Sequence, residues 1–322
     1  MNTMFAAVLS DYGQIPQPGQ LPVPVAGAGQ ALLQIEAASI KQLDKLKAAG
    51  KHYTRYAQFP VAVGVDGVGR LPDGRRMYAM GVTGMLAQQA LVQLDDCVPV
   101  PEELPAALAA LLPNALLGSD AALVCRGGFQ AGEVVLINGA TGVSGRMAVQ
   151  AARLRGASRI IVTGRNAQSL DYLRELGADQ CISLLDEPQR IIGQLLQIQQ
   201  QTPINVVLDY LWGEPVQWLL AAFAKCCPQS VRLVTIGQMA GAEINLASGT
   251  LRSVPVSILG SGLGSINAQQ LHQYNRERLT SMLARASRGE LVAGYREFAL
   301  RDVAEAWQTE LEPGERAVVY AG

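Results

Sequence analysis

The sequence predicts an α/β protein in which a doubly wound parallel sheet of six strands is inserted into a β-rich domain. From Glu133 onward, short apolar runs typical of buried strands alternate with stretches typical of helices. This alternation favours a doubly wound parallel sheet. Roughly the first hundred residues are instead rich in Gly and Pro and hold short strand-like runs, which indicate a β-rich domain. At 322 residues the chain is too long for one ordinary core.

The elements of the sheet follow from the position of the apolar runs. The predicted strands are Val134–Asn138, Arg159–Thr163, Cys181–Leu184, Val206–Asp209, Val231–Ile236 and Val254–Leu259. The predicted helices between them, two of which stop at a glycine, are Val143–Arg155, Ala167–Leu176, Pro188–Gln201 and Val216–Cys226.

The flanking parts of the chain have a different pattern. Before the sheet we expect short strands, such as Ala31–Glu36 and Val61–Val65, and an Ala/Leu-rich helix around Leu104–Leu117. After it we expect a long helix, two short strands and a small helix, over Ala268–Ala286, Arg296–Leu300, Arg316–Tyr320 and Val303–Thr309. This tail is too short for a third domain, so we expect it to rejoin the N-terminal part. The predicted domains are residues 1–115 with 261–322, and residues 116–260.

Bulk composition excludes several classes of partner. The net charge is −1 and the basic residues are scattered, which argues against binding to nucleic acid or to an anionic membrane. No apolar run reaches the roughly 18 residues that span a bilayer, and the N-terminal stretch lacks the features of a signal peptide. The five cysteines are an odd, scattered set that fits a reducing compartment. We therefore expect a cytoplasmic protein. The pair Cys226-Cys227 is either a redox site or the end of a buried helix.

A glycine-containing loop lies between the first strand of the sheet and the helix after it. It reads Asn-Gly-Ala-Thr-Gly-Val-Ser-Gly from Asn138 to Gly145. Gly142 would let the backbone approach a pyrophosphate, and Gly145 would let the helix pack closely on the strand. The free N–H groups and partial positive charge of the helix N-terminus would then face the phosphates. The predicted dinucleotide-binding residues of this loop are Ala140, Thr141, Gly142, Val143 and Ser144.

The end of the second strand predicts which dinucleotide binds. Sites for NAD usually place Asp or Glu here to bind the ribose 2′-hydroxyl, whereas this chain has Gly164, Arg165 and Asn166. Arg165 can make charge-assisted hydrogen bonds to a 2′-phosphate, and Gly164 leaves space for it. The prediction is NADPH. The alternative is that Arg165 is an ordinary solvated surface residue.

Several stretches resemble the medium-chain dehydrogenases/reductases. The sequence INGATGVSGRMAVQAARLRGASRIIVTGRN from Ile137 is similar to their cofactor loop, helix and second strand. LRELGADQCISL, VVLDYLWG and VRLVTIGQMAG are similar to their next three strands, and EAASIKQLDKLKAAGKHY and FPVAVGVDGVGR to their catalytic domain. The resemblance covers nearly the whole chain. It implies a Rossmann domain inserted into a GroES-like catalytic domain.

Departures from the family pattern point to its zinc-free, quinone oxidoreductase-like branch. Zinc-dependent members have Gly-His-Glu where this chain has Gly64-Val65-Asp66, and valine cannot coordinate a metal. The aligned stretch that usually holds a Cys ligand is Ser39-Ile40-Lys41. The four-cysteine lobe of structural zinc is missing too, so no metal is expected. Many zinc-free members have Asn at the position of Lys41, and some have Tyr at that of Leu46, so the resemblance does not identify a proton donor.

The resemblance implies hydride transfer from NADPH to a quinone or to an activated alkene such as an enone. Without a metal, an enzyme of this kind must stabilise a developing enolate or hydroquinone anion. The candidate catalytic residues are Lys41, by alignment, and Tyr53, with His52 and Tyr56 as weaker ones. The alternatives are that Lys41 only pairs with Asp44 and that the segment around Tyr53 is a surface loop. An alternative function is a cofactor-binding redox sensor or scaffold with little catalysis.

Further cofactor contacts and the assembly are also implied by the resemblance. Positions near the nicotinamide or at the carboxyl ends of later strands are Asn114, Ser119, Tyr210, Gly237, Leu259 and Gly260. Members of the family commonly pair the last strands of their nucleotide-binding sheets across a twofold axis. We therefore expect a homodimer formed through Val254–Leu259.

Overall fold

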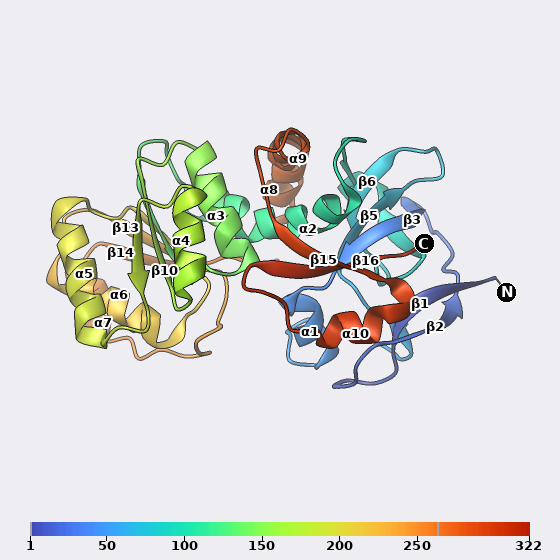
Figure 1. The fold of residues 1–322 in the computed structure, drawn as a ribbon, viewed down its shortest axis with the longest axis horizontal. Coiled ribbons are helices and arrows are strands. Elements are labelled where there is room, and N and C mark those ends of the chain that lie inside the picture. The colour runs from blue at the N-terminus through green and yellow to red at the C-terminus, as the bar shows by residue number, and fades with distance from the viewer. Residues whose placement is uncertain (1, 263) are drawn as a thin grey trace. The chain divides into compact units, whose positions relative to one another are not determined.

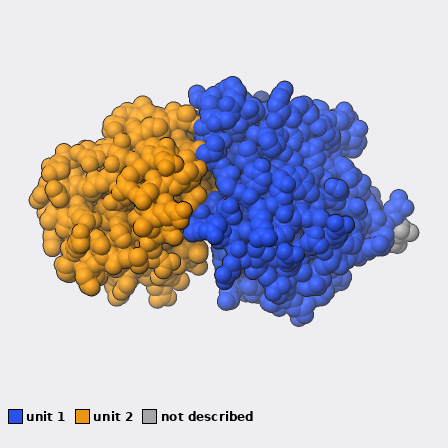
Figure 2. Space-filling model, in the orientation of Figure 1, with its two compact units in different colours: residues 1–114, 272–322 blue, residues 115–271 orange. Residues whose placement is uncertain are grey.

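The protein consists of two compact units, seen in a computed structural model that describes residues 2–262 and 264–322 (Figure 2). Unit 1 comprises Met1–Asn114 and His272–Gly322, and unit 2 comprises Ala115–Leu271. The first break lies within one residue of the predicted boundary. The second unit runs through Leu271 rather than ending at residue 260, because the chain after the last strand stays with the sheet.

Unit 2 is the predicted six-stranded parallel sheet. Its strand order is β11-β10-β9-β12-β13-β14, and every neighbouring pair is parallel. The strands are β9 (Val134–Asn138), β10 (Arg159–Gly164), β11 (Gln180–Ser183), β12 (Val206–Asp209), β13 (Val231–Thr235) and β14 (Val256–Gly260). The prediction of a doubly wound α/β domain is confirmed, because β10 and β11 lie on one side of β9, and β12, β13 and β14 lie on the other.

Helices cover both faces of this sheet (Figure 1). Alternate residues of β9 enter two separate apolar cores, Val135 and Ile137 in one, Val134 and Leu136 in the other. This explains why buried parallel strands are apolar throughout. The helices of the first core are α3 (Val143–Leu154) and α4 (Ala167–Glu175). Those of the second are α5 (Pro188–Gln201) and α6 (Gly213–Lys225). A short helix, α7 (Ser248–Ser253), was not predicted.

A long apolar helix precedes the sheet in the chain. It begins as α2 (Ala106–Leu116) and continues as a π-helical stretch, η2 (Leu117–Arg126). The expectation that no segment is long and apolar enough to cross a membrane is wrong for Ala106–Arg126, but 67% of its most apolar 18-residue window is buried inside the protein, as in a core helix. Its buried Asp120 forms a bidentate pair with Arg155, at 2.6 and 2.7 Å, which compensates the charge.

Unit 1 is built from two β-sheets. A three-stranded sheet, in the order β2-β1-β4, comprises β2 (Gln17–Pro22), β1 (Thr3–Leu9) and β4 (Val61–Ala62). A seven-stranded sheet has the order β15-β16-β3-β5-β6-β8, with β7 also paired to β3. Its members are β3 (Gln30–Ser39), β5 (Asp66–Arg70), β6 (Arg76–Met80), β7 (Gln89–Gln93), β8 (Val98–Pro99), β15 (Gly294–Ala299) and β16 (Glu315–Tyr320).

The C-terminal tail rejoins unit 1, as predicted. Strand β16 pairs antiparallel with β3, so the first and last parts of the chain share one sheet. The small helix predicted between the tail strands is α10 (Val303–Gln308). The long helix predicted over Ala268–Ala286 is present in three parts, α8 (Ala268–Gln273), the π-helical η3 (Tyr274–Leu279) and α9 (Thr280–Ser287). Unit 1 also contains helix α1 (Gln42–Ala48) and two short 3-10 helices, η1 (Leu94–Asp96) and η4 (Leu300–Asp302).

Candidate functional site

The glycine loop connects β9 to α3 at the carboxyl edge of the parallel sheet. Gly139 has φ +84°, and a Cβ on it would lie 2.6 Å from the Leu211 side chain. A Cβ on Gly145 would lie 2.5 Å from the Cα of Ala140, so only glycine lets α3 approach the loop this closely. Gly142, by contrast, has open space around its missing Cβ. The loop therefore presents Gly142 as the face that a bulky ligand can approach.

The N-terminus of α3 has the features of an anion site. Gly142 is its N-cap residue and provides no side chain to accept from the first N–H groups. In a helix of 12 residues these groups add to a partial positive charge at this end. Thr141, Val143 and Ser144 are each partly exposed here. Ala140 is fully buried, and its N–H donates to Thr163 O at 2.9 Å, so it anchors the loop to β10.

A chain of buried hydrogen bonds fixes the loop to two neighbouring strands. The Gly139 N–H donates to the Thr163 hydroxyl at 3.0 Å, and that hydroxyl donates to Asn138 Oδ1 at 2.7 Å. The Asn138 amide then donates to Asp209 Oδ1 at 2.8 Å. We call this chain, from Gly139 through Thr163 and Asn138 to Asp209, the loop relay. It links the ends of β10, β9 and β12, and so sets the position of the loop relative to the sheet.

Asp209 ends the loop relay and holds the turn after β12. The N–H groups of Leu211 and Trp212 both donate to its carboxylate at 3.1 Å. Trp212 has φ 55°, which is rare for a bulky residue and needs such support. Burial raises the pKa of Asp209 to about 6, and the hydrogen bonds from Asn138 and the backbone oppose that rise. Asp209 was not among the site residues predicted from the sequence.

The end of β10 is basic. Arg165 and Asn166 are exposed, and no carboxylate among residues 2–262 and 264–322 forms an ion pair with Arg165. The Asn166 side chain caps α4 by accepting from Ser169 N at 2.7 Å. A second cation, Arg146 of α3, donates to Thr141 O and to the Ser169 hydroxyl, each at 3.2 Å. Arg146 was not among the predicted site residues, although its place in the first turn of the helix after the glycine loop could have indicated it.

Gly164 ends β10 where little space is left. A Cβ on it would lie 2.5 Å from the Thr141 side chain, so glycine allows the strand end to contact the loop. The guanidinium of Arg146 also lies over the Tyr172 ring, 4.9 Å from its centroid. The structure therefore brings together the residues predicted for the loop and for the end of β10, and adds Arg146 between them.

The remaining predicted cofactor residues of unit 2 are structurally anchored. The Tyr210 hydroxyl donates to Gly118 O at 2.7 Å, and burial raises its pKa. A Cβ on Gly237 would lie 2.6 Å from Tyr210 O. The buried Ser119 hydroxyl donates to Ala115 O within its own helix. Leu259 is partly buried and Gly260 is exposed, and both belong to β14.

Unit 1 encloses the candidate catalytic lysine in a cluster of charges. Lys41 is only 3% exposed, and its ammonium contacts Asp66 Oδ1 at 2.5 Å, Ser39 O at 2.6 Å and Asp44 Oδ2 at 3.3 Å. Tyr78 donates its hydroxyl to the other oxygen of Asp66 at 2.7 Å. Lys41 thus pairs with Asp44, as the alternative interpretation of the sequence held, and also with Asp66. Asn114, in the same unit, accepts from Arg316 at 3.3 Å.

The other candidate catalytic residue lies at the surface of the same unit. Tyr53 is 70% exposed, and its ring stacks on His52 with centroids 3.9 Å apart. Within the part of the chain that the structure describes, no hydrogen bond joins Tyr53 to Lys41. The structure therefore does not place these two residues in one contact. Their catalytic roles remain predictions.

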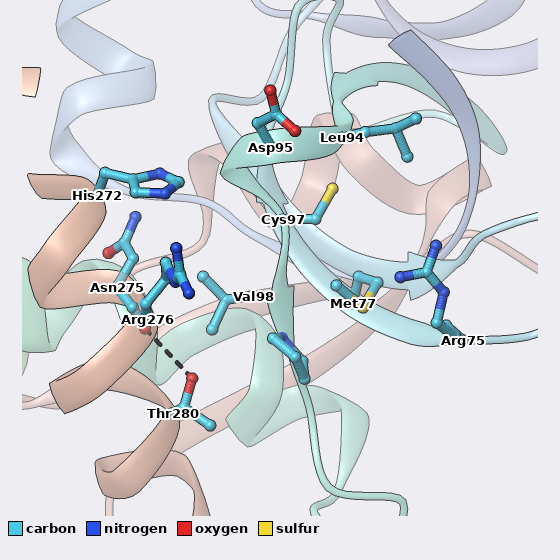
Figure 3. A pocket seen from close by; sticks show the side chains of 11 residues that line it. Arg75, Met77, Leu94, Asp95, Cys97, Val98, His272, Asn275, Arg276 and Thr280 are labelled. Atoms are coloured by element: carbon cyan, nitrogen blue, oxygen red, sulfur yellow. Dashed lines mark hydrogen bonds between the residues drawn. The ribbon is translucent and has the colours of Figure 1, made fainter. Parts of the chain in front are cut away.

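Unit 1 also has a surface cavity of about 510 Å³ that contains none of the residues predicted from the sequence (Figure 3). Leu94, Cys97 and His272 are among the residues that line it. Burial raises the pKa of the Cys97 thiol to about 11, so the thiol stays protonated and is a poor nucleophile at neutral pH. Two arginines, Arg75 and Arg276, belong to the same lining, together with Asp95. This mixed lining does not identify a ligand.

Comparison with known proteins agrees with this arrangement. Residues 144–281 match the sequence profile of the zinc-binding dehydrogenase family. The chain is 27% identical to a probable NADPH-dependent quinone reductase of Emericella nidulans, covering 96% of this chain and 95% of that protein. It is 30% identical to an NADPH-dependent alkenal/one oxidoreductase of Arabidopsis thaliana, over 57% of this chain and 53% of that one.

A solved structure supports the same assignment over the whole chain. The quinone oxidoreductase from Thermus thermophilus, solved also in complex with NADPH, is 28% identical to this chain, with a TM-score of 0.81. The likeness covers 98% of this chain and 100% of that one. Together with the strand order of unit 2 and the glycine loop before α3, these likenesses show that the chain belongs to the medium-chain dehydrogenase/reductase superfamily, in its quinone oxidoreductase-like branch.

Proposed function

We infer that this protein is an oxidoreductase that transfers a hydride from NADPH to a quinone or to an alkene conjugated with a carbonyl group. The observation that carries the choice of cofactor is the end of β10, where Arg165 has no carboxylate partner among the described residues and Arg146 lies nearby. The relatives named above reduce quinones or alkenals and alkenones with NADPH, as their names state. No observation favours the alternative of a sensor or scaffold.

The residues of unit 2 fit such a cofactor. The open space at Gly142 and the uncapped N-terminus of α3 suit a pyrophosphate, whose charge the helix end stabilises. Arg165 suits a 2′-phosphate, with Arg146 adding positive potential. When bound, NADPH supplies the hydride. The chain's own contribution is to hold the loop in place through the loop relay and to keep the binding face clear of side chains.

Hydride transfer would leave negative charge on the substrate oxygen, and Lys41 and Tyr53 are our candidates for stabilising it. Tyr53 has an exposed hydroxyl that a substrate can reach. The Lys41 ammonium is held by four oxygens, so direct contact requires a substrate oxygen to replace one of them.

We propose that this chemistry does not use zinc. The residues present do not fit the metal, because the side chain of Val65 has no donor atom and the stretch aligned with a cysteine ligand, Ser39-Ile40-Lys41, contains no cysteine. The ammonium of Lys41 already pairs with Asp66 and Asp44. We derive no step through a metal.

The test of cofactor choice is a comparison of NADPH and NADH. We expect NADPH to bind more tightly than NADH. Arg165→Ala should narrow the difference between their binding free energies by about 1–3 kcal/mol, the scale of a charge-assisted hydrogen bond. Lys225→Ala, which removes one exposed positive charge at the end of α6, is the matched control. Titration of both cofactors into each protein measures the effect. Equal affinities in the unaltered protein would overturn the proposal.

We also propose that the protein is a cytoplasmic homodimer formed through β14. This strand is the last in the order of its sheet, so one edge is unpaired within the described residues, and edges of this kind are commonly paired or protected. In the unaltered protein, pairing with a second copy would continue the sheet across a twofold axis.

A further inference from the structure

The segment that follows Lys41 carries an unbalanced positive charge. Between Asp44 and Asp66 the sequence contains no acidic residue, but it contains Lys45, Lys47, Lys51 and Arg55. Both flanking carboxylates are already bonded to Lys41. Among the described residues, no carboxylate oxygen lies within 4.0 Å of a nitrogen of these four cations. In a protein of net charge −1, this is a local excess of positive charge that no carboxylate of the described residues pairs with.

Aromatic rings hold two of these cations in place. Lys47 Nζ lies 4.7 Å from the centroid of the Tyr56 ring, and the Arg55 guanidinium carbon lies 5.8 Å from that of Tyr12. The centroids of the two tyrosine rings are 6.4 Å apart, and the Tyr12 hydroxyl donates to Tyr56 O at 3.0 Å. Phe59 packs edge-on against Tyr12 at 4.8 Å. The two tyrosine rings thus form one shelf with a cation on each of them.

The turn at Gly50 packs against the Tyr12 ring, and a third cation follows it in the chain. Gly50 has φ +68°, and a Cβ there would lie 3.2 Å from the Tyr12 ring. Lys51 follows directly and is exposed. We call Tyr12, Lys47, Lys51, Arg55 and Tyr56 the aromatic–basic patch. The neighbouring His52 has a lowered pKa, first because of burial and also because Lys47 repels its charged form, although a hydrogen bond with the backbone of Thr54 opposes this.

The aromatic–basic patch is continuous with the buried Lys41 cluster. Helix α1 (Gln42–Ala48) has Lys41 as its N-cap residue and carries Lys47 in its last turn. Burial raises the pKa of Tyr56, and the negative charge of Asp44 adds to that rise. A ligand that reaches the candidate catalytic end of unit 1 therefore meets planar rings and uncompensated cations on the same segment.

We propose that the substrate of this protein carries an anionic group, a carboxylate or a phosphate, that the aromatic–basic patch binds. This inference rests on the proposed function and names the class of quinone or enone that the site selects. The tyrosine rings hold the cations in position, and Lys47, Lys51 and Arg55 bind the anion of the substrate by charge-assisted hydrogen bonds. Neutral quinones and enones lack this contact and are the poorer substrates.

The test compares benzylideneacetone with its para-carboxylate, reduced by the full-length protein with NADPH. We expect the ratio of kcat/KM for the carboxylate to that for the neutral enone to fall by about tenfold or more in the double variant Lys47→Gln with Arg55→Gln. The matched control, Lys225→Gln with Arg278→Gln, changes the net charge equally through two exposed residues elsewhere. Its ratio should equal that of the unaltered protein.

A second variant guards against loss of folding in the first. Lys51→Glu alters an exposed side chain, and we expect it to lower the same ratio, whereas Lys225→Glu leaves the ratio unchanged. Added salt should reduce kcat/KM for the carboxylate more steeply than for the neutral enone. Equal or better reduction of the neutral enone by the unaltered protein would overturn the proposal, as would an unchanged ratio in both patch variants.

Binding measurements separate this proposal from the proposed function. The saturated ketone of each compound lacks the carbon–carbon double bond that accepts the hydride, so it is titrated into the protein with NADPH present. Tighter binding of the carboxylated ketone, lost in Lys51→Glu, supports the anionic specificity even if neither enone is reduced. Equal binding of both ketones refutes the specificity, even if quinones and neutral enones are reduced and the proposed function stands.

Discussion

The buried carboxylate of Asp209 should make the stability of the protein depend on pH in a direction opposite to that of most acidic groups. Its pKa is raised from 3.8 to about 6 because burial disfavours the charged form. A raised pKa means that the folded protein binds the proton more tightly than the unfolded chain does. The contribution of Asp209 is therefore fully present below its unfolded pKa and is lost as pH rises through its folded pKa.

The size of the effect follows from the shift. A difference of about two pKa units corresponds to about 3 kcal/mol of unfolding free energy, of which about 2 kcal/mol falls between about pH 4.5 and pH 7. Other carboxylates titrate over the same range, so the unaltered protein alone does not isolate it. Asp209→Asn keeps the size of the side chain and removes its titration. The unfolding free energy of the unaltered protein minus that of the variant should fall by this amount as pH rises.

Urea unfolding at a series of pH values measures this difference. Asp95→Asn serves as the control, because it removes a carboxylate at an exposed position, and its difference should change little with pH. The affinity for NADPH adds an independent measurement, since Asp209 holds the glycine loop through Asn138 and Thr163. A pH-independent difference for Asp209→Asn would refute the argument that burial governs this carboxylate.

Three further predictions concern Lys41, zinc and the edge strand. Lys41→Met removes the ammonium that pairs with two buried carboxylates and should lower the unfolding free energy by about 3–5 kcal/mol; a melting temperature equal to that of the unaltered protein would contradict the pairing. Elemental analysis should find no stoichiometric zinc, and a chelator should leave activity intact; one zinc per chain would refute this. Ile258→Lys on β14 should convert a dimer to a monomer in light scattering at micromolar concentration, and a monomeric unaltered protein would exclude the proposed dimer.

The strands of unit 2 were predictable because each is specified locally. A strand buried on both faces is apolar at nearly every position, as Val134–Asn138 is, and a glycine or helix cap follows within a few residues. The glycine loop was predictable for the same reason. Its anchoring through Asp209 was not, because that carboxylate lies 71 residues beyond Asn138 in the chain and meets it only through the pairing of β9 with β12.

Unit 1 was harder to predict because its pairings are distant in sequence and its strands are not strongly apolar. Strand β5 reads Asp-Gly-Val-Gly-Arg, in which little favours a strand without its neighbours β3 and β6. The run Val61–Val65 forms a strand only over Val61–Ala62, since Gly64 has φ +102° and turns the chain. Sequence suggested Asp44 as the partner of Lys41, three residues away, but folding was needed to bring in Asp66.

The Lys41 cation is part of the chain, so the folding of unit 1 needs no separate ion at this position. A metal ion between two carboxylates must be delivered to the folded chain, can be outcompeted, and is lost on dilution below its dissociation constant. An ammonium on the chain arrives with synthesis, at a local concentration fixed by the backbone, and no chelator can remove it. The cation that pairs with Asp44 and Asp66 is therefore encoded in the sequence and does not depend on the supply of metal in the cell.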